Sequence, residues 1–257
     1  MLKLVDVHAH LSDNLLLADL DNVRREYLEK GVSLVIDSGC SLKNVKNCAL
    51  NSQKYSEVYF TAGLHPEHSS AQNELDQILN YAKCEKCVAI GEIGLDYHYE
   101  GYNKNEQKQA FITQLEFACS VGLPVVIHSR DACFDTVSIL TEHKNLLKNG
   151  FLMHCYSESL ETAKQLLKLG AHFSFGGSLT FKNSNRIQVF KNLPLEVLHL
   201  ETDSPYLTPT PYRGNRNSPK FIDITYDFVA NSLGIDKEFL AEKLYNNAIN
   251  FFKKIKV

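Results

Sequence analysis

The chain has 257 residues, of which 44% are hydrophobic and 22% are charged, and its formal net charge is -3. This composition is typical of a globular protein with a buried core. The slight negative charge argues against a basic coat over the whole surface, so any polyanionic partner must be held by a local site.

The N-terminal residues lead directly into an apolar strand pattern, without a signal-peptide pattern, and no apolar stretch approaches membrane-spanning length. Seven cysteines without a secretion signal indicate free thiols in a reducing compartment, so we expect a cytoplasmic protein without a membrane partner. The spacing of Cys84 and Cys87 fits a zinc or redox pair, but no second pair completes such a site, which favours two ordinary thiols. We interpret four other thiols, Cys40, Cys48, Cys119 and Cys133, as small buried hydrophobic residues.

Eight short apolar runs follow one another along the chain, and amphipathic helical patterns separate most of them. A glycine or proline precedes most of the later runs, as expected where helices end and the chain reverses into a sheet. The predicted strands are 4–11, 32–36, 58–63, 87–91, 123–127, 150–153, 171–175 and 196–200. The predicted helices include 20–28, a helix capped by Ser41, 73–82, 105–121 and two closing helices within 221–257.

Near-continuous apolar runs indicate strands that are covered on both faces, and hence a parallel sheet. Eight strand–helix units in about 250 residues match the size of a TIM barrel. A doubly wound sheet is the competing arrangement, but it usually collects its site at one switch point rather than on most strands. We therefore predict an α/β protein, with a single-domain (β/α)8 TIM barrel over residues 1–257.

Side chains of the kinds that bind metals stand at the ends of most predicted strands. They are His8, His10, His65, Glu92, His128, His154 and Asp203. One such residue at a strand end is more often a hydrogen-bonding group, but the strand ends of a barrel ring one mouth, where these residues converge. Four histidines and two carboxylates are enough to hold two metal ions with one carboxylate bridging.

The first strand places His8 and His10 on one face, and Asp6 joins them if the pleat stays regular. The other histidines, His68, His98, His143, His172 and His199, lack this placement and receive no role.

Several motifs resemble, in order along the chain, those of the TatD family of metal-dependent deoxyribonucleases. They are DVHAHL (6–11), GLHP (63–66), GEIGLDY (91–97), HCYS (154–157), ETDSP (201–205), PYRGNRN (211–217) and NAINFF (247–252). Ala9 departs from the cysteine that is frequent in the family. Glu158 replaces a usual glycine, and we expect it to reshape or acidify the loop after the sixth strand.

The resemblance implies a TIM-barrel hydrolase that cleaves phosphodiester bonds in DNA, with single-stranded ends as the expected substrate. It implies that His8, His10, Glu92 and Asp203 serve one divalent cation. Glu92, His128 and His154 serve the other, so that Glu92 bridges the two. Magnesium is expected for activity, while manganese or zinc also suits imidazole-rich ligation. We expect a monomer with DNA as its partner.

Glu92 and Asp203 are the expected catalytic residues, with Asp203 orienting the attacking water and accepting its proton. The expected substrate contacts are His65, Arg130 and Arg213 to phosphate oxygens and Asn217 to the neighbouring nucleotide.

Two alternatives remain at this point. An amidohydrolase-type enzyme acting on a small ester, amide or aminoacyl ester often bridges its metals with a carboxylated lysine, where this chain offers Glu92. A non-catalytic nucleic-acid-binding protein has no need of two complete metal sites, and it predicts a basic surface that this composition does not provide.

Overall fold

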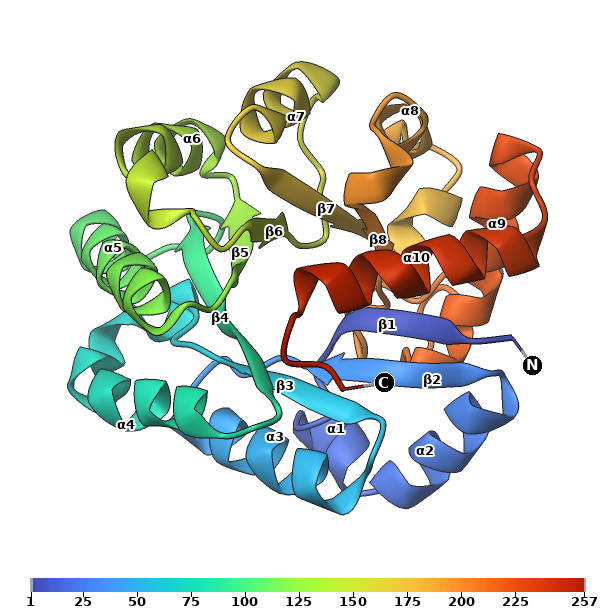
Figure 1. Ribbon diagram of the computed structural model, residues 1–257, viewed down its shortest axis with the longest axis horizontal. Helices are drawn as coiled ribbons and strands as arrows, with labels where there is room; N and C mark the ends of the chain where they lie inside the picture. Colours follow the sequence, from blue (N-terminus) through green and yellow to red (C-terminus); the bar gives the residue numbers. More distant parts are fainter. Residues whose placement is uncertain (1, 257) are drawn as a thin grey trace.

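Eight parallel strands form one sheet in the order of the sequence, and helices surround this curved sheet (Figure 1). The computed structural model describes residues 2–256. The strands are β1 (Leu4–Ala9), β2 (Val32–Asp37), β3 (Val58–Ala62), β4 (Cys87–Asp96), β5 (Val125–Arg130), β6 (Phe151–Met153), β7 (Ala171–Phe175) and β8 (Leu198–Leu200). The α-helices are α1 (Asn14–Leu17), α2 (Leu20–Glu29), α3 (Leu42–Lys54), α4 (Leu75–Leu79), α5 (Lys104–Val121), α6 (Cys133–Glu142), α7 (Leu160–Leu167), α8 (Arg186–Lys191), α9 (Ile222–Leu233) and α10 (Lys237–Phe251). The 3₁₀ helices are Pro66–Glu74, Asn80–Lys83, Lys144–Leu146, Gly177–Thr180, Leu195–Val197 and Pro219–Phe221. The predicted TIM barrel is confirmed.

The barrel closes between β1 and the segment that follows β8. The Asp203 amide donates a hydrogen bond to the His8 carbonyl oxygen at 2.9 Å, and the His10 amide donates to the Ser204 carbonyl oxygen at 2.7 Å. These bonds join the first strand to the chain after the last strand at the end of the barrel where the predicted ligands lie.

Asp6 strengthens this closure and does not join His8 and His10, as a regular pleat would require. The pairing of β1 with β2 shifts register between Asp6 and Ala9. The fully buried Asp6 carboxylate accepts hydrogen bonds from the Thr202 amide at 2.9 Å and the Thr202 hydroxyl at 2.6 Å. Asp6 therefore links β1 to the segment after β8.

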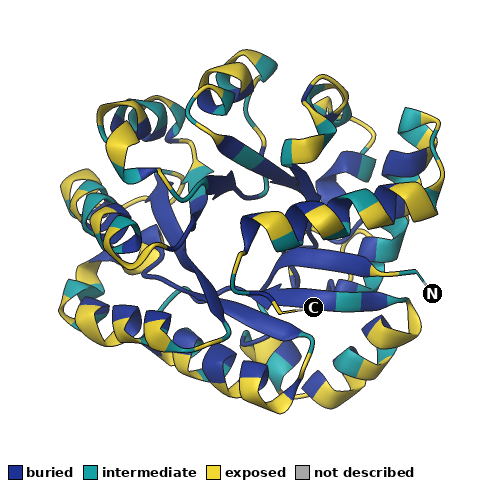
Figure 2. Ribbon diagram, viewed as in Figure 1, coloured by how far each residue is buried: buried dark blue, intermediate teal, exposed yellow. Residues whose placement is uncertain are grey.

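Apolar side chains form one layer inside the barrel and another between the barrel and its helices. The strands consist mostly of buried residues, whereas buried and exposed residues alternate along the surrounding helices (Figure 2). Strand residues of the inner layer, such as Val5, Leu34 and Val88, pack together with Phe251 and Phe252 near the end of α10. Helix α10 crosses the N-terminal end of the barrel (Figure 1). This helix covers the N-terminal end of the barrel. Polar side chains gather at the opposite end, where the strands have their C-termini.

Several element boundaries follow local signals in the sequence. The Ser41 hydroxyl accepts a hydrogen bond from the Asn44 amide and caps α3, as predicted. Gly122 follows α5 with a φ of 71°, a left-handed conformation that favours glycine at a helix end. The predicted helix 73–82 is instead a short α-helix between two 3₁₀ segments.

Two strands extend beyond their predicted ends. The parallel pairing of β4 with β5 continues to Gly94 opposite His128 and to Asp96 opposite Arg130. Glu92 and His128 therefore lie within strands rather than after them. The polar side chains of the extended segments have partners in the site. Their polarity therefore does not force the strands to end before them. The eighth strand is shorter than predicted, because residues 195–197 form a 3₁₀ turn.

Candidate metal centre

Glu92 lies at the centre of the converging side chains, and each of its carboxylate oxygens faces a different pair of histidines. Oε2 is 3.4 Å from His8 Nε2 and 3.8 Å from His10 Nε2. Oε1 is 3.0 Å from His128 Nδ1 and 2.7 Å from His154 Nε2. Burial opposes the negative charge of Glu92, but the surrounding histidines hold its pKa well below the usual value. The Glu92 carboxylate therefore lies between two pairs of imidazole nitrogens.

Asp203 lies on the side of the centre that holds the first histidine pair. Its Oδ1 is 3.3 Å from His10 Nε2 and 3.7 Å from His8 Nε2. Burial opposes its ionisation, but the hydrogen bond from His10 and the charge of the nearby histidines lower the pKa of Asp203. The structure thus brings together all six predicted metal ligands.

The donor atoms fit divalent metal ions. Within each histidine pair the nitrogens approach closely, with 3.3 Å between His8 Nε2 and His10 Nε2 and 3.1 Å between His128 Nδ1 and His154 Nε2. Ligands bound to one zinc-sized ion at about 2.0–2.1 Å lie no more than roughly 4.2 Å apart, which these spacings satisfy. One ion would be held by His8, His10, Glu92 and Asp203, and the other by Glu92, His128 and His154.

Two buried carboxylates lie behind these histidines, and one of them, Asp96, forms a hydrogen bond that orients a ring. Asp96 Oδ2 is 2.9 Å from His128 Nε2, which directs Nδ1 of that ring toward Glu92. Glu201 Oε1 is 3.7 Å from His154 Nδ1, and the other Glu201 oxygen accepts from the Ser174 hydroxyl at 2.5 Å. A partner such as Asp96 fixes the tautomer of a metal-bound imidazole, whereas Glu201 is too far from His154 for a hydrogen bond. Both carboxylates stand in sequence motifs named above, but neither was predicted to have a role.

His65 also points at Glu92, but as a hydrogen-bond donor. The Glu67 amide donates to His65 Nδ1 at 3.2 Å, so a neutral His65 ring carries its proton on Nε2, which is 3.5 Å from Glu92 Oε1. Burial lowers the pKa of His65 and favours this neutral form. His65, Glu92 and His128 lie close enough to share an ion, yet a protonated Nε2 has no lone pair to offer. This geometry fits the predicted contact with a phosphate oxygen.

The interpretation of Cys40 as an ordinary buried hydrophobic residue is wrong. Its sulfur lies 3.6 Å from His10 Nδ1 and 3.6 Å from Glu92 Oε2, and its thiol is directed at the carboxylate. No sequence pattern pointed to this position, because Cys40 comes after β2, which supplies no predicted ligand. All seven cysteines are free thiols, as expected, and Cys84 is half-buried beside Lys86 rather than in a metal site.

The predicted substrate contacts occupy different environments. Arg130 and Arg213 both lie in exposed positions, with Arg130 over the Tyr99 ring and Arg213 over the Phe181 ring. Both guanidinium groups are thus available at the surface.

The prediction that Asn217 contacts the neighbouring nucleotide is wrong. Its side chain is fully buried, and its amide nitrogen donates to the backbone carbonyl oxygens of Thr202 at 2.9 Å and Tyr206 at 2.5 Å. Its side-chain oxygen accepts from the Ser218 amide at 2.8 Å. Asn217 therefore shapes the loop after β8 and has no free group for a nucleotide.

Strained backbone conformations gather in the loops around this end of the barrel. The non-glycine residues with positive φ in the described chain are Asp131, Cys155, Asp203 and Leu207, and they all follow β5, β6 or β8. Residues in this conformation carry a cost and concentrate at functional sites.

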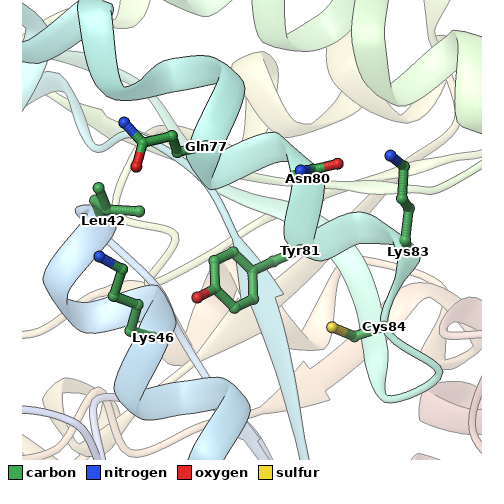
Figure 3. Close-up of a pocket in the computed structure, with 7 residues that line it drawn as sticks. All are labelled: Leu42, Lys46, Gln77, Asn80, Tyr81, Lys83 and Cys84. Carbon is green, nitrogen blue, oxygen red and sulfur yellow. The ribbon is translucent and has the colours of Figure 1, made fainter.

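Two surface cavities lie away from the metal centre. One, of about 490 Å³, lies between α3 and α4 and is lined by residues that include Lys46, Tyr81 and Cys84 (Figure 3). The second, of about 460 Å³, includes Lys86 and Lys254. Neither cavity contains a residue of the metal centre. Among residues 2–256, no helix is both long and apolar enough to span a membrane.

Comparisons with known proteins find relatives described as metal-dependent hydrolases, in agreement with the cluster of potential metal ligands. Residues 5–253 match the family described as TatD related DNase. The uncharacterized metal-dependent hydrolase YabD of Bacillus subtilis (strain 168) is 35% identical over 253 residues, which cover 97% of this chain and 99% of that protein. The uncharacterized metal-dependent hydrolase YcfH of Escherichia coli (strain K12) is 34% identical over 254 residues, covering 97% of this chain and 95% of that protein.

Solved structures give the same result. The TatD homolog YJJV from Escherichia coli K12 superimposes with a TM-score of 0.89 at 27% identity, covering 97% of this chain and 98% of that one. An uncharacterized amidohydrolase from Saccharomyces cerevisiae, with a TM-score of 0.85 at 18% identity over 98% of this chain and all (100%) of that one, shares the fold. The chain therefore belongs to the TatD family of metal-dependent hydrolases.

Proposed function

We propose that this protein hydrolyses phosphodiester bonds in DNA, at single-stranded ends, with two divalent cations. The observation that carries the proposal is the division of Glu92 between two histidine pairs, because a carboxylate shared in this way would hold two cations close enough together to act on one phosphodiester. The family description as a DNase supports the choice of substrate. We further propose magnesium as the activating ion, with manganese or zinc as alternatives that the imidazole ligands also suit.

When bound, two cations would lower the pKa of a shared water and neutralise charge on the phosphate. Asp203 then orients the attacking water and accepts its proton, a role that its ionised state and its place beside His10 support. The His65 Nε2–H group donates to a phosphate oxygen near Glu92. Arg130 and Arg213, both exposed, bind phosphates farther along the strand.

A hydrolase acting on a small ester or amide is the competing function. Its support is the fold shared with proteins such as a β-aspartyl dipeptidase, at 15% identity. Such identity speaks for the fold alone. No contact in the described chain specifically favours a small amide, so we rank this function second.

The test is a matrix of substrates and metals. Single-stranded DNA, duplex DNA, RNA and small esters are each incubated with magnesium, manganese or zinc after the purified protein has been stripped of metal. We expect cleavage of single-stranded DNA to exceed that of the other substrates. Turnover of a small ester with no cleavage of any oligonucleotide would contradict the proposal.

A further inference from the structure

Exposed aromatic side chains are concentrated around the mouth of the barrel. In the described chain the exposed aromatic residues are Tyr99, Tyr102, Phe134, Tyr206, Tyr212 and Phe239. All except Phe239, which belongs to α10, follow β4, β5 or β8 and so lie at the end that holds the metal centre. Exposed aromatic rings are costly in water and are the surfaces on which unpaired bases stack.

Three of the five rings at this end of the barrel pack on a side chain outside the metal centre. Arg130 lies over Tyr99, Tyr102 stacks on Tyr97, and Tyr212 packs on Phe221. Tyr206 differs from them because its neighbour is a residue of the metal centre itself. Its ring centroid is 5.9 Å from that of His10, at an interplanar angle of 66°.

Tyr206 is also held firmly from several sides. Its amide donates to the Asp203 carbonyl oxygen at 2.9 Å, and its own carbonyl oxygen accepts from Asn217. Its hydroxyl donates to Asp13 at 3.1 Å. The side chain is nevertheless half exposed, at 50%. A ring that is fixed at its backbone and its hydroxyl, yet open to solvent, loses little entropy when a flat partner covers it.

We propose that Tyr206 is the platform on which the base of a nucleotide next to the cleaved phosphate stacks. The inference rests on the proposed phosphodiesterase function. It adds a contact that depends on a base of the substrate rather than on the charge of the phosphate backbone. The T-shaped contact with His10 places the ring beside the His10 and Asp203 side chains, so a phosphate bound at these residues would bring the adjoining base to Tyr206. A paired base in an intact duplex cannot present its face in this way, which gives single strands an advantage.

The experiment is a cycle of protein and substrate changes. Single-stranded oligonucleotides carry one abasic residue at successive positions from either end, and kcat and KM are measured for the wild type, Tyr206→Leu and Tyr206→Phe. In the wild type, removing the base next to the cleaved bond should raise KM roughly fivefold or more, the effect of one lost stacking contact. Tyr206→Leu should raise KM on the intact strand by a similar factor and should no longer distinguish the intact from the abasic strand. Tyr206→Phe, which loses only the bond to Asp13, should still distinguish them.

Tyr212→Leu is the matched control, since this exposed tyrosine of the same loop packs on Phe221, and it should keep the wild-type discrimination. Metal content and the circular dichroism spectrum of each variant establish that the centre and the fold persist. If Tyr206→Leu cleaves intact strands and discriminates against the abasic strand as the wild type does, the platform is refuted while the nuclease function stands. If the wild type cleaves no oligonucleotide with any metal, both are refuted.

Discussion

At the scale of single residues, Glu92 serves two histidine pairs because its two oxygens point to opposite sides of the centre. We expect Glu92→Gln to lose both ions, since the amide replaces one oxygen by a donor group and removes the negative charge. Metal stoichiometry, measured by elemental analysis, should fall together with hydrolysis, while the circular dichroism spectrum stays unchanged. Wild-type turnover at normal metal content would show that Glu92 does not bridge.

Asp96 should affect the centre without touching a cation. Asp96→Asn weakens the bond that orients His128, so we expect metal affinity to fall by roughly 10- to 100-fold, the usual effect of losing a partner behind a ligand. A metal titration followed by calorimetry measures this change. Asp131→Asn is the control, because Asp131 is exposed and its side chain pairs with His98. Equal affinities for the two variants would refute the role of Asp96.

At the scale of elements, Lys86 ties the end of α3 to the start of β3. Its ammonium group donates to the carbonyl oxygens of Ser52 and Tyr55 at 2.8 Å, Ser56 at 2.9 Å and Val58 at 3.2 Å. These carbonyl groups include those that the helix leaves without backbone partners, and the cation also suits the negative end of the helix dipole.

We therefore expect Lys86→Met, which keeps the length of the side chain but removes the charge, to lower the free energy of unfolding by about 1–3 kcal/mol. Urea denaturation measures the change. Lys83→Met, at an exposed lysine nearby, should be close to neutral. A loss of the same size at both positions would indicate a general effect of charge rather than the cap.

The strands, and the ligands that stand at their ends, could be predicted because both depend on local patterns. Apolar runs separated by helical spacing define the barrel, and the barrel places His8 and His154 at one mouth. Asp96 and Cys40 could not be placed in this way. Their roles depend on the extension of β4 and on the path of the chain after β2, which the ladder contacts with neighbouring strands determine. The placement of Asn217 likewise depends on which carbonyl groups the folded loop leaves without partners.

At the scale of the whole molecule, a histidine pair formed by the half-buried His172 and the buried His199 makes stability depend on pH. His172 Nδ1 and His199 Nε2 are 2.9 Å apart, and Phe251 of α10 packs against both rings. Burial lowers the pKa of His172 to about 4. Burial, together with the neighbouring His172, holds the pKa of His199 well below its ordinary value. Both rings are therefore neutral in the folded state at neutral pH.

In the unfolded chain these histidines titrate near pH 6.5. Between about pH 6.5 and pH 4 the unfolded state binds more protons than the folded state, so stability falls as the pH falls. We expect His172→Gln to lose stability less steeply than the wild type over this range, in urea denaturation at a series of pH values. His68→Gln, at an exposed histidine, should follow the wild type. Parallel curves for all three proteins would contradict the assignment.

The closure of the barrel by the bonds between His8, His10, Asp203 and Ser204 has a consequence for the newly made chain. Residues almost 200 positions apart must meet before His8, His10 and Asp203 lie together, and closing so long a loop costs entropy before its contacts can stabilise the fold. Tight metal uptake therefore marks the finished molecule. A chain that is still emerging from the ribosome, or one whose first strand has detached, lacks the assembled centre. It therefore has no hydrolytic activity until β1 contacts the segment after β8.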